Sequence, residues 1–147
     1  VDLKIARIFN SYGPNMLLND GRAISNFIKQ GLIKEPLTIY GDGYQTRSFC
    51  YVDDLINGFI DLMNSEYNKP LNLGNNYEIS ILELAKKICQ KINVKESFKF
   101  EKAIEGEPKR RCPDLKNTYK KLEWRPKIEL NKGLDLTIKY FKESYFS

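Results

Sequence analysis

Apolar positions along the chain follow two different spacings. The run from residue 3 to residue 9 is almost continuous, which is typical of a strand buried on both faces of a parallel sheet. Between residues 21 and 33 the apolar positions recur every three to four residues, which predicts a helix. Asn19 and Asp20 come just before this helix and suit its N-cap position.

The middle of the chain predicts two extended segments and a second helix. The segments are residues 37–40 and 45–52, and the turn sequence Gly41-Asp42-Gly43 separates them. Helical spacing returns at Asp53, and the carboxylates of Asp53 and Asp54 fall where a helix N-terminus favours negative charge. We therefore expect these two residues to stabilise the helix start rather than to act as an acid–base pair.

The second half predicts two more strands and three more helices. A strand at residues 70–73 precedes Ser80, which stands three residues before Glu83 in the spacing of a capping box and opens a helix through residue 92. A strand around residues 98–100 is followed by a short helix that Asp114 can cap and by a C-terminal helix that Asn131 can cap. Trp124 lies between these last two helices, where we expect it to anchor the C-terminal segment.

The alternation of strands and helices predicts an α/β fold in a single partial domain that covers residues 1–147. A parallel strand buried on both faces needs neighbouring strands, and few other segments of this chain have that pattern. The chain also begins at Val1, without an initiator Met. We therefore expect the partners of the first strand to be encoded upstream or to come from another copy.

The composition is that of a globular protein with a hydrophobic core, since 41% of the 147 residues are hydrophobic and 29% are charged. No apolar run approaches the ~18 residues that span a bilayer, and the start does not resemble a secretion signal. We therefore expect a cytoplasmic protein with no membrane partner. The three cysteines lack Cys-x-x-Cys spacing, which favours reduced thiols over disulfides or a zinc site.

The chain contains no histidine, which excludes a Ser-His-Asp triad, a Cys-His pair and a histidine-based zinc site within it. We expect no metal. The net charge is +5, but acidic residues are spread among the basic ones, so nucleic acid is not an expected partner. The densest basic cluster, Lys109-Arg110-Arg111, is compatible with either a few bound phosphates or a solvated loop.

Six motifs carry a resemblance to a known family. They are ARIFNSYGP (residues 6–14), NDGR (19–22), PLTIYGDG (36–43), QTRSFCYVDD (45–54), NLGN (72–75) and RCPD (111–114). In this order they resemble the C-terminal part of the extended short-chain dehydrogenase/reductase family, over nearly all of the chain. Within that family, the second and fourth motifs favour the branch that decarboxylates UDP-glucuronate over the related 4,6-dehydratases and 4-epimerases.

The resemblance implies the C-terminal part of an NAD-binding Rossmann-type fold with its small substrate-binding subdomain. The parent enzyme would be an NAD-dependent lyase, commonly a homodimer, that converts UDP-glucuronate to UDP-xylose and CO2. The family's Gly-x-x-Gly-x-x-Gly turn and catalytic Tyr-x-x-x-Lys pair do not occur in this sequence. We therefore expect the glycine-rich cofactor half and the catalytic residues to be absent, and the chain alone to be inactive and not to bind NAD. A non-catalytic nucleotide-sugar binding module is the alternative.

The resemblance also implies a set of binding residues. Arg47 would contact the diphosphate of the nucleotide sugar, because a guanidinium offers paired donors to phosphate oxygens. Arg111 would lie over the diphosphate or the carboxylate end and help to position the sugar. Asn10 would hydrogen-bond the nucleotide sugar, and Ser11 and Arg22 would lie close to the nicotinamide half of NAD. Taken without the resemblance, these residues are also compatible with surface arginines and a simple turn.

Overall fold

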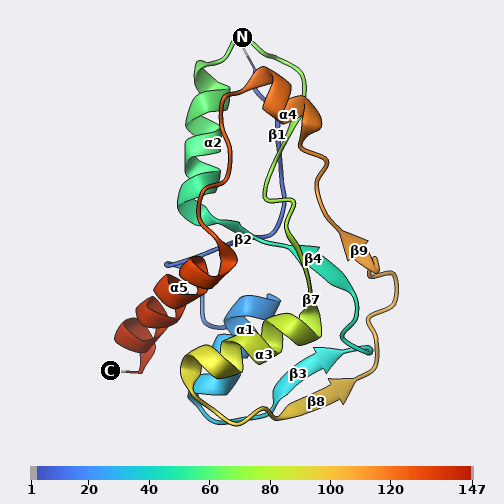
Figure 1. Cartoon of the computed structure of the whole chain (residues 1–147), viewed down its shortest axis with the longest axis vertical. Coiled ribbons are helices and arrows are strands. Elements are labelled where there is room, and N and C mark those ends of the chain that lie inside the picture. Colours follow the sequence, from blue (N-terminus) through green and yellow to red (C-terminus); the bar gives the residue numbers. More distant parts are fainter. Residues whose placement is uncertain (1–2, 147) are drawn as a thin grey trace.

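A computed structural model describes residues 3–146 of the protein. These residues form nine short strands and five helices in an elongated arrangement (Figure 1). Two clusters of buried apolar side chains hold the strands and helices together. The order of the elements and the parallel strand pairs confirm the predicted α/β class.

The smaller cluster lies at the end of the molecule that contains the N-terminus (Figure 1). There, β1 (Ala6–Ile8) pairs in parallel with β6 (Leu71–Leu73), beside helices α2 (Val52–Asn64) and α4 (Lys116–Lys121). Trp124 is buried in this cluster, and its indole Nε1 donates a hydrogen bond of 2.7 Å to the Asp54 carbonyl. This contact confirms the predicted anchoring role of Trp124.

The first strand differs from its prediction. β1 covers three residues and, within the described chain, pairs only with β6. Leu3 and Ile8 are 63% and 54% exposed. Burial of this strand on both faces is therefore not observed among the described residues, in which β1 has a single neighbouring strand. The expectation that further neighbours are encoded upstream or come from another copy stays a prediction.

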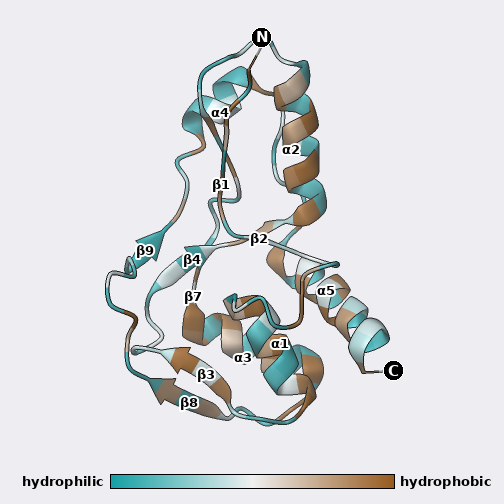
Figure 2. Ribbon diagram, turned by 180° about the vertical axis from the view of Figure 1, so that it is seen from behind, coloured by the Kyte–Doolittle hydropathy of each residue, from teal (hydrophilic) through white to brown (hydrophobic). Residues whose placement is uncertain are grey.

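Helix α2 also leaves apolar side chains exposed. Ile56, Ile60 and Met63 recur at helical spacing and are 49%, 49% and 70% exposed, whereas Leu55 and Leu62 are buried. Figure 2 shows the resulting mixture of hydrophobic and hydrophilic positions along α2. The apolar spacing that predicted the helix thus includes two faces, of which only one packs against the core.

The larger cluster lies at the opposite end and is covered by three helices. They are α1 (Ala23–Leu32), α3 (Ile81–Ile92) and α5 (Leu130–Tyr145). The parallel pair of β3 (Leu37–Tyr40) and β8 (Phe98–Glu101) closes this end. Phe27, Ile28, Ile88 and Phe141 are completely or almost completely buried where the helices meet.

Five further strands connect the two ends. β2 (Ser11–Tyr12) pairs in parallel with β5 (Cys50–Tyr51). β4 (Thr46–Ser48) lies between β7 (Glu78–Ser80), which is antiparallel to it, and β9 (Arg110–Arg111), which is parallel. The segment predicted as one strand over residues 45–52 is therefore two strands separated by Phe49, because each part pairs with different partners.

The predicted helix caps have mixed outcomes. The capping box is confirmed, since Ser80 Oγ accepts the Glu83 N–H and the Glu83 carboxylate accepts the Ser80 N–H. The other predicted caps are wrong by one to three residues. The N-caps are Arg22 instead of Asn19 or Asp20, Leu115 instead of Asp114, and Glu129 instead of Asn131.

Asp54 explains where the last helix begins. Asp53 and Asp54 lie in the first turn of α2, as predicted, and Asp54 is buried. Its Oδ2 accepts the backbone N–H groups of Lys127 (2.9 Å) and Ile128 (2.7 Å). Because the carboxylate fixes these two residues, the chain turns into α5 directly after them, before it reaches Asn131.

Candidate functional site

The structure brings the five residues that the sequence singled out to one cavity. This cavity has a volume of about 230 Å³, and its lining includes Asn10, Ser11, Arg22, Arg47 and Arg111. These residues come from the end of β1, from β2, from the start of α1, and from the neighbouring strands β4 and β9. We refer to it below as the arginine cavity. Their roles toward a ligand stay predictions.

Asn10 is fixed by its backbone and by its side chain. Its φ of 36° lies in the left-handed region, which asparagine tolerates better than most residues do. The Asn10 amide Nδ2 donates to the Ser48 carbonyl at 2.9 Å, and the Asn10 carbonyl accepts the Cys50 N–H at 3.1 Å. These bonds tie the end of β1 to the β4–β5 segment and hold the amide at the cavity.

Arg47 is a buried cation with one carboxylate partner. It is 5% exposed, and its Nη1 donates to the Thr46 carbonyl at 2.8 Å. Its Nη2 pairs with Glu107 Oε1 at 2.5 Å. A buried guanidinium is costly unless it is paired, so Glu107 offsets part of the burial cost of Arg47.

Arg111 and Arg22 extend the positive charge of the cavity. Arg111 is the register partner of Arg47 across the β4–β9 pair, and its side chain is exposed. Arg22 binds the Asp20 carboxylate through Nε (2.7 Å) and Nη2 (2.6 Å), and its Nη1 donates to the Ser11 carbonyl (3.2 Å). Arg22 and Ser11, both expected on the cofactor side, are therefore in direct contact.

The charges of the lining residues favour a ligand with more than one negative charge. Three arginines and one carboxylate, that of Glu107, line the arginine cavity. Guanidinium groups bind phosphate oxygens through paired, charge-assisted hydrogen bonds. Sequence reasoning missed Glu107. The available signal was an acidic residue two positions before the basic cluster at residues 109–111.

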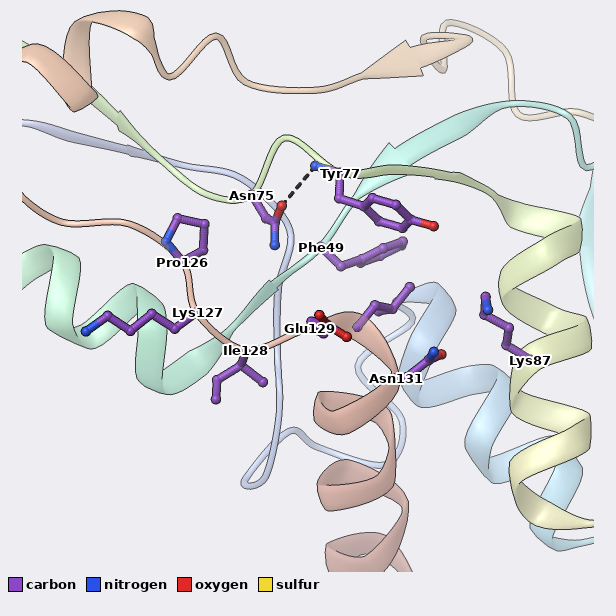
Figure 3. A pocket seen from close by; sticks show the side chains of 10 residues that line it. Phe49, Asn75, Tyr77, Lys87, Pro126, Lys127, Ile128, Glu129 and Asn131 are labelled. Carbon is purple, nitrogen blue, oxygen red and sulfur yellow. Dashed lines mark hydrogen bonds between the residues drawn. The ribbon is translucent and has the colours of Figure 1, made fainter.

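A second, larger cavity of about 350 Å³ shares the wall formed by Phe49 (Figure 3). Figure 3 shows the Tyr77 ring beside Phe49, with Lys87 of α3 and Asn131 of α5 on the opposite side. The Asn75 side chain accepts the Tyr77 N–H at 2.9 Å. Because Phe49 is common to both cavities, it separates the two spaces.

The thiols do not contribute a nucleophile. All three cysteines are free. Burial raises the pKa of Cys50 to about 12 and also raises the pKa of Cys89 and Cys112. A protonated thiol is a poor nucleophile.

Within residues 3–146, no group of three His, Cys, Asp or Glu side chains is placed to hold a metal ion. No helix in the same range has the length and apolar character to cross a membrane.

An ion pair behind the cavity gives a prediction for pH dependence. The Glu78 carboxylate binds Arg110 through Nε (2.9 and 3.0 Å) and Nη2 (2.6 Å), and it accepts a hydrogen bond from Thr46 Oγ1. The Arg110 hydrogen bonds, helped by Thr46, lower the pKa of Glu78 from 4.5 to about 2. A carboxylate whose pKa is lower in the folded state than in the unfolded state stabilises the fold at a pH above its unfolded-state pKa. This stabilisation is lost as the pH falls from the unfolded-state pKa through the folded-state pKa.

We therefore expect the destabilisation caused by Glu78→Gln to be constant near neutral pH and to shrink as the pH falls from about 5 to about 2. Urea unfolding of both proteins at several pH values measures this difference. The same substitution at the exposed Glu66 is the control. A difference that does not depend on pH would contradict the lowered pKa of Glu78.

The starts of the five described helices lack the turn that commonly holds NAD. A dinucleotide pyrophosphate is held where a glycine-rich turn leads from a strand into a helix. The residues before the five helices are Arg22, Tyr51, Ser80, Leu115 and Glu129, and no glycine-rich turn precedes any of them within residues 3–146. The expected contact of Ser11 and Arg22 with the nicotinamide half of NAD stays a prediction.

The chain is similar to curated UDP-glucuronic acid decarboxylases. UDP-glucuronic acid decarboxylase 2 of Arabidopsis thaliana is 47% identical over 146 residues, which are 99% of this chain and 33% of that protein. UDP-glucuronic acid decarboxylase 1 of Xenopus tropicalis is 46% identical over 97% of this chain and 34% of its own length. The chain thus spans about a third of the length of these curated relatives.

A solved structure has the same fold. The UDP-glucuronic acid 4-epimerase of Bacillus cereus, in complex with UDP-glucuronic acid and NAD, matches with a TM-score of 0.91 and 32% identity. The match covers 99% of this chain and 46% of that one. It confirms the predicted Rossmann-type class, of which this chain contains a part.

The family model described as GDP-mannose 4,6 dehydratase matches residues 1–137. This match and the decarboxylase relatives confirm the resemblance to extended short-chain dehydrogenases/reductases. The chain belongs to the GDP-mannose 4,6 dehydratase family.

Proposed function

We propose that this chain is the nucleotide-sugar binding part of a UDP-glucuronate decarboxylase, the enzyme that converts UDP-glucuronate to UDP-xylose and CO2. The observation that carries the proposal is the arginine cavity, whose lining includes three guanidiniums from separate segments and the Glu107 carboxylate, which pairs with Arg47. The similarity to UDP-glucuronic acid decarboxylases over 97–99% of the chain supports this substrate class.

The proposal gives each residue of the arginine cavity a role. Arg47 and Arg111, adjacent across the β4–β9 pair, hold the diphosphate. Asn10 hydrogen-bonds the sugar. Ser11 and Arg22 contact the nicotinamide half of NAD when the parent enzyme holds it. These roles bind and orient the substrate, and the chemical step lies with groups that this chain does not supply.

NAD dependence of the parent enzyme is part of the proposal, and the solved epimerase complex with NAD supports it. The absence of the glycine-rich turn and of the Tyr-x-x-x-Lys pair from this sequence supports the division between a binding part and a cofactor part. Residues 1–147 as a single partial domain, a homodimeric parent and a cytoplasmic location stay predictions.

Titration calorimetry of the chain with UDP, UDP-glucuronate and NAD tests the proposal. We expect saturable binding of UDP and UDP-glucuronate, and no NAD binding tighter than the millimolar range. A micromolar dissociation constant for NAD would contradict the expected absence of the cofactor part. Failure of both UDP ligands to bind would refute the nucleotide-sugar site.

A 4-epimerase is the second candidate, because a solved UDP-glucuronic acid 4-epimerase shares the fold and 32% of the sequence. The decarboxylase relatives have higher identity, at 47% and 46%. Product analysis with the parent enzyme separates the two reactions. A decarboxylase releases CO2 from UDP-glucuronate, whereas a 4-epimerase keeps all of its carbon atoms.

A further inference from the structure

Glu107 already pairs with Arg47, the cation to which the proposed function assigns the diphosphate. Its Oε1 lies 2.5 Å from Arg47 Nη2. The two side chains differ in exposure, at 6% for Arg47 and 35% for Glu107. The carboxylate therefore lies on the solvent side of the pair, where an incoming anion would meet it first.

The loop between β8 and β9 places Glu107 there. Gly106 has a φ of 79°, and the Glu107 N–H donates to the Ile104 carbonyl at 3.2 Å, which closes a tight turn. A Cβ at Gly106 would meet nothing within 4 Å, so the turn faces open space at this residue. Downstream, the Lys109 carbonyl accepts the Thr46 N–H at 2.9 Å. Lys109 is thus fixed to β4 two residues after Glu107.

The charge arrangement predicts which anions can replace Glu107. A ligand with a single carboxylate would exchange one carboxylate for another at Arg47 and gain little. A diphosphate presents several charged oxygens, and it can bind Arg47 and Arg111 at once because the two lie opposite each other in register. Only the polyanion gains a contact that Glu107 does not already make.

We propose that Glu107 is an internal counter-ion of Arg47 that the diphosphate of the ligand displaces, and that this exchange makes the site select polyanions over monoanions. Glu107 is thus a specificity-determining residue of the same cavity, and the inference rests on the proposed function. Besides the residues that bind the ligand, the cavity thus contains one residue that competes with the ligand for Arg47.

Glu107→Gln tests the exchange, because the amide is nearly isosteric but carries no charge. We expect inorganic pyrophosphate and UDP to bind this variant about 5- to 10-fold more tightly than the wild-type chain, since a modest ion pair no longer has to be broken. Acetate, which is a monoanion, should show no binding to the wild type and weak, measurable binding to the variant. Titration calorimetry at constant ionic strength measures all three ligands.

Glu105→Gln is the matched control, because it removes the same charge from the same exposed loop at a residue that does not line the cavity. We expect it to change pyrophosphate binding by less than about 2-fold, since solvent and salt screen an exposed charge. Equal gains in the two variants would show a general charge effect and would overturn the exchange. Unchanged or weaker binding to Glu107→Gln would also overturn it, because Glu107 would then only orient Arg47.

A measurement on the wild-type chain makes the test independent of how well the variant folds. The side-chain carboxyl ¹³C resonance of Glu107 should move toward that of the exposed Glu105 when pyrophosphate saturates the site. A Glu107 resonance that stays constant while pyrophosphate binds would overturn the displacement. If wild type and variant both fail to bind pyrophosphate and UDP, the proposed function itself is wrong, and the exchange falls with it.

Discussion

Arg47→Ala is expected to weaken UDP binding to this chain by about 1.5–3 kcal/mol, or roughly 10- to 150-fold, which is the usual cost of losing hydrogen bonds between charged groups. The guanidinium is nearly buried at the arginine cavity and is held by the Thr46 carbonyl and by Glu107. The side chain therefore needs little reordering when a diphosphate binds. Titration calorimetry with UDP measures the loss.

Arg110→Ala is the control for this prediction. Arg110 lies on the neighbouring strand β9 and carries the same charge, but it pairs with Glu78 and does not line the arginine cavity. We expect its replacement to change UDP affinity by less than about 3-fold, because it removes only a screened, longer-range attraction. Equal losses in the two variants would mean that net charge, and not a contact with Arg47, drives binding. Thermal unfolding of each variant checks that it is folded.

Trp124→Ala is expected to lower the free energy of unfolding by about 3–5 kcal/mol, the range for removal of a buried aromatic side chain. The indole is 5% exposed and packs closely on α2, where a Cβ at Gly58 would lie 3.0 Å from the ring. Its replacement also leaves the Asp54 carbonyl without the indole N–H. The cavity would open between α2 and the segment that leads to α5.

Urea unfolding followed by far-UV circular dichroism measures this loss, because the chain has no other tryptophan to report by fluorescence. Trp124→Phe is the matched control. It keeps most of the apolar volume and loses the hydrogen bond, so we expect a much smaller cost, of about 1–2 kcal/mol. A loss below about 1 kcal/mol for the alanine variant would show that the C-terminal segment is not anchored through this side chain.

The parts of the fold that depend on local sequence were predictable. Helical spacing located the helices, and the Ser80 and Glu83 pair fixed the start of α3, because each signal lies within one or two turns of the chain. The start of α5 was not predictable from nearby residues. It depends on the Asp54 carboxylate, which binds backbone N–H groups more than seventy positions away in the sequence.

The candidate site also has a part that local sequence predicts and a part that depends on how distant segments pack. The motifs predicted Arg47 and Arg111 as binding residues, but only the pairing of β4 with β9 puts them opposite each other. Glu107 was missed because an acidic residue in an exposed loop has no periodic signal, and its role depends on where the loop folds. The apolar run of the first strand indicated what this strand can bury, and the scarcity of similar segments indicated that most of its neighbours lie outside this chain. Among the described residues it has one neighbour, β6.

The two ends of the molecule are interleaved along the sequence, and this governs how the chain can fold. β1 pairs with β6, and β4 pairs with β9, and each of these pairs joins segments that are far apart in the sequence. Such a topology has a high contact order, which slows folding because long loops must close before the pairs can form. Neither end consists of one continuous segment, so we expect the described chain to unfold in a single cooperative transition and no shorter piece of it to retain one end alone.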